Sequence, residues 1–488
     1  MTQSKLIERG FMAYKIVANI NPQIFRGYDI RGVMDEDLNE DVYYTFGRAY
    51  ATWLSQRRIV DCSVGCDNRI TSKAYKKAFI TGLNDGGIET YDLGYALSQI
   101  VYFSAYEYKT KGYAMITASH NPREYNGLKL GTGYSETMLS EEVIAFRELI
   151  KEGVYVEPMA KGRNHRVQIF DAYLRTILKN FHLNRKWKVV VDASNTTSGM
   201  FYPEILHEAG CTVIEQNCKL DGNFPLGVPD PTEVEVLERL REGVLKHQAD
   251  LGLAYDADGD RMAVVDENGK VLWMDAIVAL FADDVLDTMP GAPIVFNNLC
   301  SKAVSQTIEK RGGKPVMWIT GHSFIKAKIK ELNAPFGGEL SGHIFFNDNF
   351  FGHDDAAYAS LRLLSYLERK GKTLGQAVAD LPKFVTSPEI KLGLADEIKF
   401  KFIKEVITKD LKKEFKDGEY NMIDGVRVDT ETAMVTIRAS QNGPYITIKF
   451  EGKTKKEYDN LRRILMKILS SHKEIDWTKG VNTHAFEG

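Results

Sequence analysis

The stretch that decides the fold is RIVDCSVGCDNRITSKAYKKAFITGLNDGGIETYDL, residues 58–93. It opens with the apolar run Arg58–Gly65, which predicts a strand, and passes through the polar loop Cys66–Thr71. A helix is predicted over Lys73–Asp85, and it stops at Gly86–Gly87 because glycine suits the left-handed position that closes a helix. A second strand follows over Ile88–Leu93. This order is a βαβ crossover, which implies parallel strands.

The same pattern occurs twice more in the chain. The glycine stops of the three copies lie ~100–125 residues apart, which is the spacing of domains rather than of solenoid repeats. Chance recurrence of a common motif is the alternative explanation. The later copies are a strand, a helix and a strand over Trp187–Val191, Met200–Ala209 and Thr212–Glu215, and then over Pro293–Phe296, Ala303–Arg311 and Lys314–Ile319.

The last hundred residues follow a different pattern. Strands are predicted over Asp424–Val428, Ala433–Arg438 and Tyr445–Phe450, and an amphipathic helix over Lys455–Ser471. No strand–helix–strand unit of the earlier type is expected there. We therefore predict three similar α/β domains with mixed sheets, at 1–165, 166–272 and 273–384, and a smaller α+β domain at 385–488.

Length, charge and composition exclude several classes of protein. The chain has 488 residues, whereas one packed core rarely exceeds ~250–300 residues. Lys+Arg is 63 and Asp+Glu is 66, so the net charge of -3 argues against a surface built for sequence-independent nucleic-acid binding. Hydrophobic residues are 44% and charged residues 26%, which excludes a disordered chain.

The start of the chain and the cysteine count indicate in which cellular compartment the protein lies. No run approaches the ~18–20 apolar residues of a membrane span, and Lys5, Glu8 and Lys15 interrupt the start of the chain where a secretory signal would be apolar. Five cysteines argue against a disulfide framework, and Cys62 and Cys66 lack a second pair for zinc. We expect a cytoplasmic protein that binds neither nucleic acid nor membrane.

The first loop with candidate chemistry is Thr117–Pro122, directly after an apolar run. Ser119 would present a hydroxyl at the exit of a strand, and a hydroxyl needs a base, a metal or both to act as a nucleophile. His120 is its neighbour, and Lys129 follows shortly as a possible cation. The alternative is an ordinary turn serine. We expect this loop to be exposed, so that Ser119→Ala would remove turnover and spare folding.

The second loop is Asp256–Arg261, after a strand of buried type. Asp256, Asp258 and Asp260 alternate, so on an extended segment their carboxylates project to one side. They would repel one another unless a cation lay between them, and oxygen ligands suit Mg²⁺ or Ca²⁺. A calcium loop is not expected because helices do not flank the segment. Arg261 adds a positive charge, and a solvated acidic turn is the alternative.

Two further loops carry polar groups for a sugar phosphate. Glu339, Ser341 and His343 alternate before an apolar run and offer an acceptor, a hydroxyl and a switchable donor. The segment Arg438–Pro444 combines Arg, Ser and amide side chains with a glycine-bearing turn, which suits an anion. Structural turns are the alternative for both. Near the start of the chain, Arg31 could reach a phosphate.

One such loop lies in each predicted domain. A hydroxyl nucleophile, a metal site, a hydroxyl-binding loop and an anion site would meet if the four domains surrounded one cleft. Together they indicate Mg²⁺-assisted phosphoryl transfer on a sugar phosphate.

With these motifs in this order, the chain resembles the α-D-phosphohexomutases, and within them the bacterial phosphomannomutase/phosphoglucomutase branch. The resemblance extends roughly from Ile24 to Gly452, and its most specific part is the combination of Thr117–Pro122 with Asp256–Arg261. Phe25–Gly32, Gly338–His343 and the segment around Asp230 agree with it.

The resemblance implies a heart-shaped protein of four domains around an active-site cleft. Ser119 would carry a phosphoryl group and bind one Mg²⁺ per chain with Asp256, Asp258 and Asp260. His120 and Lys129 are then candidates for acid–base work, and Arg31 and Arg261 for stabilising phosphoryl charge. Substrate-binding residues would be Tyr28, Glu339, Ser341, His343, Arg438, Ser440, Gln441 and Asn442.

The implied activity is that of a mutase that interconverts hexose 1-phosphate and hexose 6-phosphate, with mannose and/or glucose as the sugar. Phosphoserine would pass its phosphoryl group to the free hydroxyl and form a hexose 1,6-bisphosphate, the intermediate and activator. After the bisphosphate turns over in the cleft, its other phosphate would return to Ser119. Small-molecule sugar phosphates are the expected partners, and the chain is expected to be a monomer or weak dimer.

Several positions depart from the pattern of that branch. Gln441 and Asn442 stand in the anion loop where Asn-Thr is usual, and Lys449 stands in place of Arg. Ile319 occupies the place of an expected Lys, and Leu97-Ser98-Gln99 replaces a segment containing Thr-Pro. The preferred sugar, the pathway and the role of residues 1–23 do not follow from the sequence.

Three other functions stay open at this point. Within the family, a phosphoglucosamine or other sugar-phosphate mutase is the nearest alternative. From a different class, Asp256-x-Asp258 after a strand is typical of a Mg²⁺-dependent phosphohydrolase in which Asp256 is the nucleophile, but that leaves Ser119 without a role. A non-catalytic sugar-phosphate sensor is the third.

Overall fold

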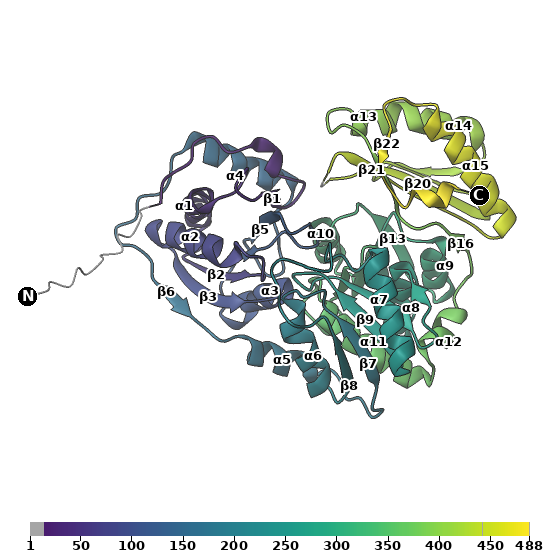
Figure 1. Cartoon of the computed structure of the whole chain (residues 1–488), viewed down its shortest axis with the longest axis horizontal. Coiled ribbons are helices and arrows are strands. Elements are labelled where there is room, and N and C mark those ends of the chain that lie inside the picture. Colours follow the sequence, from purple (N-terminus) through teal and green to yellow (C-terminus); the bar gives the residue numbers. More distant parts are fainter. Residues whose placement is uncertain (1–13, 442, 488) are drawn as a thin grey trace, which may run out of the picture.

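The computed structural model describes residues 14–441 and 443–487. Four sheets follow one another along the chain, and helices pack against each of them. The C-terminal sheet and its helices lie at the upper right of Figure 1. This agrees with the prediction of three mixed-sheet α/β domains and a C-terminal α+β domain. No helix in the described part of the chain is both long and apolar enough to cross a bilayer.

The first sheet has six strands in the order β1-β5-β4-β2-β3-β6. Strands β2, β3, β4 and β6 run parallel, and β5 and β1 add an antiparallel edge. Its elements are η1 (Pro22–Ile24), β1 (Ile30–Val33), α1 (Glu40–Gln56), β2 (Asp61–Cys66), α2 (Ser72–Asp85), β3 (Glu89–Tyr95), α3 (Ser98–Glu107), β4 (Gly112–Ile116), β5 (Tyr125–Gly131), α4 (Ser140–Glu152) and β6 (Asn164–Arg166).

The second sheet has five strands in the order β11-β10-β9-β7-β8, and β7 runs parallel to both β8 and β9. The metal-type loop predicted at Asp256–Arg261 joins β9 to β10, which are antiparallel. The elements are α5 (Phe170–Leu178), β7 (Lys188–Asp192), α6 (Ser198–Glu208), β8 (Thr212–Gln216), α7 (Val234–His247), β9 (Leu251–Tyr255), β10 (Met262–Asp266) and β11 (Val271–Leu272).

The third sheet has four strands in the order β13-β12-β14-β15, with β12 parallel to β13 and β14. The predicted hydroxyl-binding loop turns between β14 and β15. The elements are α8 (Met274–Thr288), β12 (Pro293–Asn297), α9 (Lys302–Lys310), β13 (Lys314–Trp318), α10 (His322–Leu332), β14 (Phe336–Gly338), β15 (Ile344–Phe346), α11 (Ala356–Lys370) and α12 (Leu374–Ala379).

The fourth sheet is antiparallel, in the order β18-β19-β20-β21-β17-β22, and β16 pairs with β21. The predicted anion loop joins β20 to β21. The elements are β16 (Val385–Thr386), β17 (Ile390–Gly393), α13 (Lys399–Phe402), η2 (Ile403–Ile407), α14 (Thr408–Glu414), β18 (Glu419–Asn421), β19 (Val426–Asp429), β20 (Ala433–Ala439), β21 (Tyr445–Gly452), α15 (Lys455–Ser470), β22 (Asp476–Val481) and η3 (Thr483–Phe486).

All three predicted crossovers are present. In each copy the two strands pair in parallel, β2 with β3, β7 with β8 and β12 with β13. Parallel strands leave their carboxyl ends at one edge of a sheet, so the loops that follow them share that edge. The predicted boundary at residue 165 falls inside β6, which still pairs with β3.

The described residues form several apolar clusters, and the first domain has one of its own between α1, α2 and its sheet. Another is continuous from α3 and β4 of the first domain, through the second domain, to α11 of the third. The fourth domain has a separate core between its sheet and α15. It is attached to the third domain by buried polar contacts, in which Arg427 donates to the carbonyl oxygens of Asn298 and Cys300 and Lys449 pairs with Asp275.

Candidate active site

All four domains contribute side chains to one cleft. Tyr28, Arg31, Ser119, His120 and Lys129 come from the first domain, and Arg261 comes from the second. Glu339, Ser341 and His343 enter from the third, and Arg438, Ser440 and Gln441 enter from the fourth. The loops singled out in the sequence therefore converge, and the four-domain arrangement around a cleft is as predicted.

The Ser119 loop, which joins β4 to β5, is held by an arginine that the sequence motif does not contain. Ser119 has a φ of +50°, in the left-handed region where a non-glycine residue needs support from its surroundings. Arg69 is completely buried and pairs with Asp67 at 3.0 Å. Its guanidinium donates to the carbonyl oxygens of Ser119, Asn121, Pro122 and Tyr125.

The expectation of an exposed Ser119 loop is wrong. Ser119 is only 2% exposed, because its hydroxyl is enclosed between the first and second domains. The hydroxyl donates to Asp256 Oδ2 at 2.9 Å and lies 3.2 Å from His120 Nδ1. Arg261 Nη2 is 3.4 Å from the same oxygen. The serine therefore already faces a carboxylate, a base and a cation.

Asp256, Asp258 and Asp260 form a buried acidic group whose carboxylates converge. Burial, together with the charges of Asp260 and Asp258, raises the pKa of Asp256 to about 8. One oxygen each of Asp258 and Asp260 is buried without a hydrogen-bond partner among the described residues. Unpaired carboxylate oxygens in this setting match the donor set of a hard divalent cation, so these residues fit Mg²⁺.

Lys129 lies against two of these carboxylates. Its ammonium group contacts Asp258 at 2.6 Å, Asp260 at 2.5 Å and Ser98 at 3.3 Å. Burial alone would lower the pKa of Lys129, but the adjacent carboxylates raise it above its ordinary value. Three partners engage its three N–H groups, so Lys129 is held as a fixed cation.

His120 has the opposite electrostatic setting. Burial and the nearby Arg261 and Arg31 lower its pKa well below the ordinary value, which keeps the imidazole neutral. Its Nε2 lies 3.9 Å from Asp230, and Asp230 also lies 3.5 Å from Arg261. Of the two predicted acid–base candidates, the geometry therefore favours His120 over Lys129.

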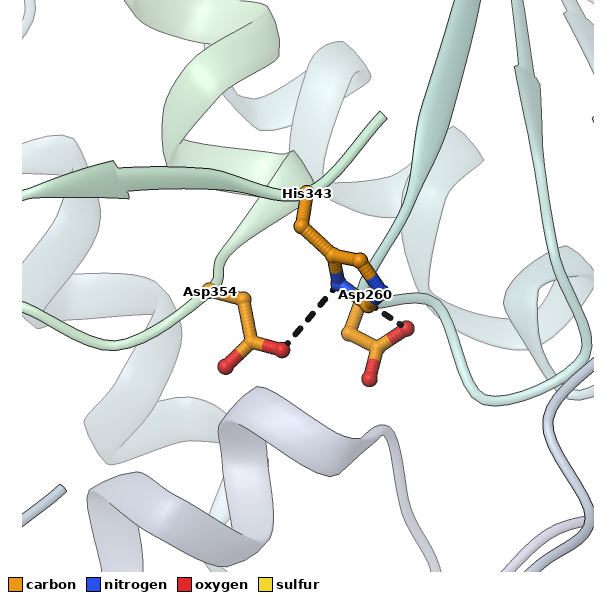
Figure 2. A group of neighbouring side chains, drawn as sticks. All are labelled: Asp260, His343 and Asp354. Carbon is orange, nitrogen blue, oxygen red and sulfur yellow. Dashed lines mark ion pairs between the residues drawn. The ribbon is translucent and has the colours of Figure 1, made fainter. Parts of the chain in front are cut away.

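His343 contacts carboxylates from two domains, as Figure 2 shows. Its Nδ1 lies 3.2 Å from Asp354 and 3.8 Å from Asp260. Burial would lower the pKa of His343, but Asp260 and Asp354 raise it above its ordinary value. The other Asp354 oxygen pairs with Lys326 at 3.0 Å. Because Lys129 and Lys326 already offset these carboxylates, the cluster in Figure 2 is a charge-balanced network beside the acidic group.

A short backbone bridge joins the metal-type loop to the hydroxyl-binding loop. Arg261 and His343 form an antiparallel β-bridge, and Met262 N–H donates to Gly342 O at 3.3 Å. Gly342 has a φ of +96°, and a Cβ there would lie 2.3 Å from Met262 O. Glycine is therefore required at this position by both conformation and space.

Glu339 is fully buried at the base of the cleft. One of its carboxylate oxygens accepts from Gly321 N–H at 2.7 Å, and the other is without a hydrogen-bond partner in the described chain. Burial raises the pKa of this carboxyl above its ordinary value. Ser341 lines the cleft beside it.

The first domain adds Arg31 and Tyr28 to the wall of the cleft. Arg31 pairs with Asp29 at 2.8 Å and donates to Asn121 Oδ1 at 2.6 Å, which ties it to the Ser119 loop. The ring of Tyr28 packs edge-on against His322, with 4.7 Å between ring centroids.

The predicted anion loop places Arg438, Ser440 and Gln441 at the cleft, and Asn442 lies outside the described residues. Arg438 is buried, and its Nε donates to Asp424 at 2.7 Å.

The other departures have different consequences for the site. Lys449 pairs with Asp275 and does not line the cleft, and Ile319 does not line it either. Ser98, from the departing segment, donates to Asp258 at 2.7 Å.

The sequence interpretation missed several residues that the fold brings to the site. They include Arg69, Asp354, Lys326 and Lys391, which lie outside the motifs and have no local signal of their own. Asp230 lies in a segment that resembles the family, and this resemblance is the sequence signal that could have identified it as a site residue.

Three family models match the chain. They are described as domains I, II and III of phosphoglucomutase/phosphomannomutase, alpha/beta/alpha, and they match residues 22–152, 171–269 and 273–384.

Individual proteins agree with these models. A protein of Pseudomonas syringae pv. tomato named phosphomannomutase/phosphoglucomutase is 38% identical over 449 residues, which is 92% of this chain and 95% of that one. A phosphoglucomutase of Neisseria gonorrhoeae is 32% identical over 94% of this chain and 100% of its own length. The crystal structure of a phosphoglucomutase/phosphomannomutase family protein from Burkholderia thailandensis superposes with a TM-score of 0.84 at 30% identity, covering 92% of this chain and 98% of that one. With four domains around one cleft and these similarities along almost its whole length, the chain belongs to the phosphoglucomutase/phosphomannomutase family of the α-D-phosphohexomutases.

Proposed function

We propose that this chain is a phosphohexomutase that interconverts hexose 1-phosphate and hexose 6-phosphate, with mannose and/or glucose as the sugar. The observation that carries the proposal is the Ser119 hydroxyl, 2.9 Å from Asp256 and 3.4 Å from Arg261, in a cleft to which all four domains contribute. The names of the relatives support the same reaction.

Asp256, Asp258 and Asp260, with a phosphoryl oxygen on Ser119, would hold one Mg²⁺. The metal would offset negative charge on the transferring phosphoryl group. The unpaired oxygens of Asp258 and Asp260 support this assignment.

In the first transfer, the bond between phosphorus and Ser119 Oγ breaks, and a bond forms between phosphorus and the free hydroxyl oxygen of the hexose phosphate. The hydroxyl proton goes to a base, for which we propose His120, since its neutral imidazole lies beside Ser119. Arg261 and Arg31 would stabilise charge on the phosphoryl oxygens. The product of this step is a hexose 1,6-bisphosphate and unmodified Ser119.

The second transfer reverses these bonds at the other end of the sugar. The bisphosphate turns over in the cleft, and its second phosphate passes to Ser119 while the proton returns to the sugar oxygen. Glu339, Ser341 and His343 would hold sugar hydroxyls in both orientations, and Arg438, Ser440 and Gln441 would hold the phosphate that does not react. Asn442 is expected to join them.

Added bisphosphate would rephosphorylate enzyme that has lost its phosphoryl group, which makes it an activator. We place the reaction in the cytoplasm, because all five cysteines are unpaired and buried, as suits a reducing compartment. A monomer or weak dimer stays a prediction.

Phosphorus NMR of the purified protein with Mg²⁺, a hexose 1,6-bisphosphate and each hexose 1-phosphate tests the function. Conversion of mannose and glucose 1-phosphates is expected. Conversion of glucosamine 1-phosphate alone would move the assignment to a phosphoglucosamine mutase. Binding without conversion would indicate a sensor.

Ser119→Ala tests the nucleophile. We expect kcat to fall at least about 10³-fold, because alanine has no hydroxyl to carry the phosphoryl group. Arg261 Nε still donates to Asp256 Oδ2 in the variant, so the melting temperature should stay within about 3 °C of the parent. Peptide mass spectrometry locates the phosphoryl group, and phosphate on Asp256 instead of Ser119 would identify an aspartyl phosphohydrolase.

A further inference from the structure

We propose that Lys391 binds the phosphate of the substrate that does not react, as a second cation beside Arg438. Lys391 lies on β17, outside the four loops from which the sequence predicts the site. It lines the same cleft as Ser119 and Arg438. This assignment rests on the proposed mutase function, because it concerns how that function holds its substrate.

Strand register places Lys391 and Arg438 on the same face of the fourth sheet. Lys391 pairs with Thr447 across β17 and β21, and Thr447 pairs with Arg438 across β21 and β20. Directly opposed residues in antiparallel strands project to the same face. The three residues therefore form one row, with a hydroxyl between two cations that are roughly 10 Å apart at the backbone.

Lys391 forms no ion pair and no hydrogen bond through its ammonium group within residues 14–441 and 443–487. That group lies 5.7 Å from the centre of the Tyr445 ring, which is its one side-chain contact among these residues. By contrast, Arg438 is paired with Asp424, Lys399 with Asp396, and Lys449 with Asp275. Lys391 therefore has its ammonium group available to an anion, beside the guanidinium N–H groups of Arg438 that Asp424 does not engage.

The surroundings keep Lys391 charged. Burial would lower its pKa, but Glu389, Tyr445 and Asp230 raise it above the ordinary value. Lys391 is half-buried, and an ammonium group that has lost part of its water without gaining a close counter-ion is destabilising. A phosphate dianion in the cleft would supply that counter-ion.

Lys391 and Arg438 both enter the cleft from the fourth domain, on strands β17 and β20. A phosphate held from two strands of the fourth domain would stay attached while the sugar turns over.

Lys391→Met, which keeps the length of the side chain without its charge, tests the proposal, with Lys391→Arg as the conservative variant. Lys479→Met on the neighbouring strand β22 is the matched control, because that lysine is exposed. Calorimetric titration with glucose 1-phosphate measures Kd, and steady-state assays measure KM and kcat. Circular dichroism melting checks the fold of each variant.

We expect Lys391→Met to raise Kd and KM about tenfold or more and to change kcat less than about threefold, because the contact is made equally before and during transfer. Lys391→Arg should restore Kd to within about threefold, and Lys479→Met should leave it unchanged. An unchanged Kd in Lys391→Met would overturn the proposal, as would a lowered melting temperature that Lys391→Arg fails to restore.

Failure of the mutase function and failure of the Lys391 contact give different results in this experiment. If the parent protein does not interconvert sugar phosphates but Lys391→Met still weakens glucose 1-phosphate binding, the mutase function fails and the phosphate ligand stands. If the parent protein turns over and the Kd does not depend on Lys391, only the assignment of Lys391 fails.

Discussion

Asp256 is fully buried together with Asp258 and Asp260. Lys129 and Arg261 contact this group directly, and His343 lies 3.8 Å from Asp260. Lys129 and His343 lie against Asp258 and Asp260, which leaves Asp256 facing the repulsion of both carboxylates with Arg261 as its direct cationic contact. Lys129 lowers the pKa of Asp258 against the effect of burial, so Asp258 stays negatively charged. Burial and repulsion by Asp260 and Asp258 then raise the pKa of Asp256 to about 8. Without a divalent cation, this carboxyl holds a proton at neutral pH.

This proton links metal binding to pH. The folded-state pKa of Asp256 lies above its unfolded value of 3.8, so its contribution to stability is present below that value and is lost as pH rises toward about 8. Mg²⁺ must displace the proton, so we expect its apparent affinity to rise about tenfold per pH unit up to about pH 8. Thermal melts with saturating MgCl₂ or EDTA should show a stabilisation by Mg²⁺ that grows over this range.

Asp256→Asn supplies the control for this linkage. It removes the titrating group, so any remaining stabilisation by Mg²⁺ should no longer grow between about pH 6 and pH 8. A pH dependence that persists in the variant would assign the proton to another group.

At the scale of elements, the bridge between the loop after β9 and the loop before β15 determines where His343 lies. Gly342→Ala would place its methyl group 2.3 Å from Met262 O and force the two strands apart. A displacement of about 1 Å at a positioned group can cost ~10²-fold in rate, so we expect kcat/KM to fall by about that factor. Unfolding should be easier by about 1–3 kcal/mol, measured by urea titration.

Gly371→Ala is the control for Gly342→Ala, because it introduces the same strain of a positive φ without a steric clash. Gly371 ends α11 with a φ of +61°, but a Cβ there would meet nothing within 4 Å. This variant should lose about 1 kcal/mol and retain its activity within about twofold. Equal losses of activity in both variants would mean that the bridge does not position His343.

The elements that were predictable from sequence are those with local signals. The helix predicted over Lys73–Asp85 is α2, and the βαβ crossover around it was visible because apolar runs and glycine stops are local features. Asp256–Asp260 were recognisable because they are adjacent in sequence. Arg69 and Lys391 were not, since their roles depend on a loop and a strand that only the folded chain brings near. The burial of Ser119 was missed for the same reason, because another domain covers it.

At the scale of the whole molecule, the domains do not all have separate cores. The apolar cluster that includes Tyr113 of β4, Val191 of β7 and Phe296 of β12 crosses three domains. The fourth domain packs around its own cluster, with Leu465 of α15 at its centre. Its contacts with the third domain are mainly polar, and its core is smaller than both the shared cluster and the first domain's own cluster. We therefore expect it to open at a lower free energy than the other three domains.

Native-state hydrogen exchange tests this division with Ile205→Ala, a truncation in α6 within the shared cluster. We expect the opening free energies of amides in β4, β7 and β12 to fall together by about 2–5 kcal/mol, while those in β20 and β21 stay unchanged, since the fourth domain opens without exposing Ile205. Leu465→Ala is the reciprocal variant and should lower all of these values, because any wider unfolding includes the fourth domain. If Ile205→Ala lowered the values for β20 and β21 by the same amount, the four domains would form one cooperative unit, and the separate core of the fourth domain would have no thermodynamic consequence.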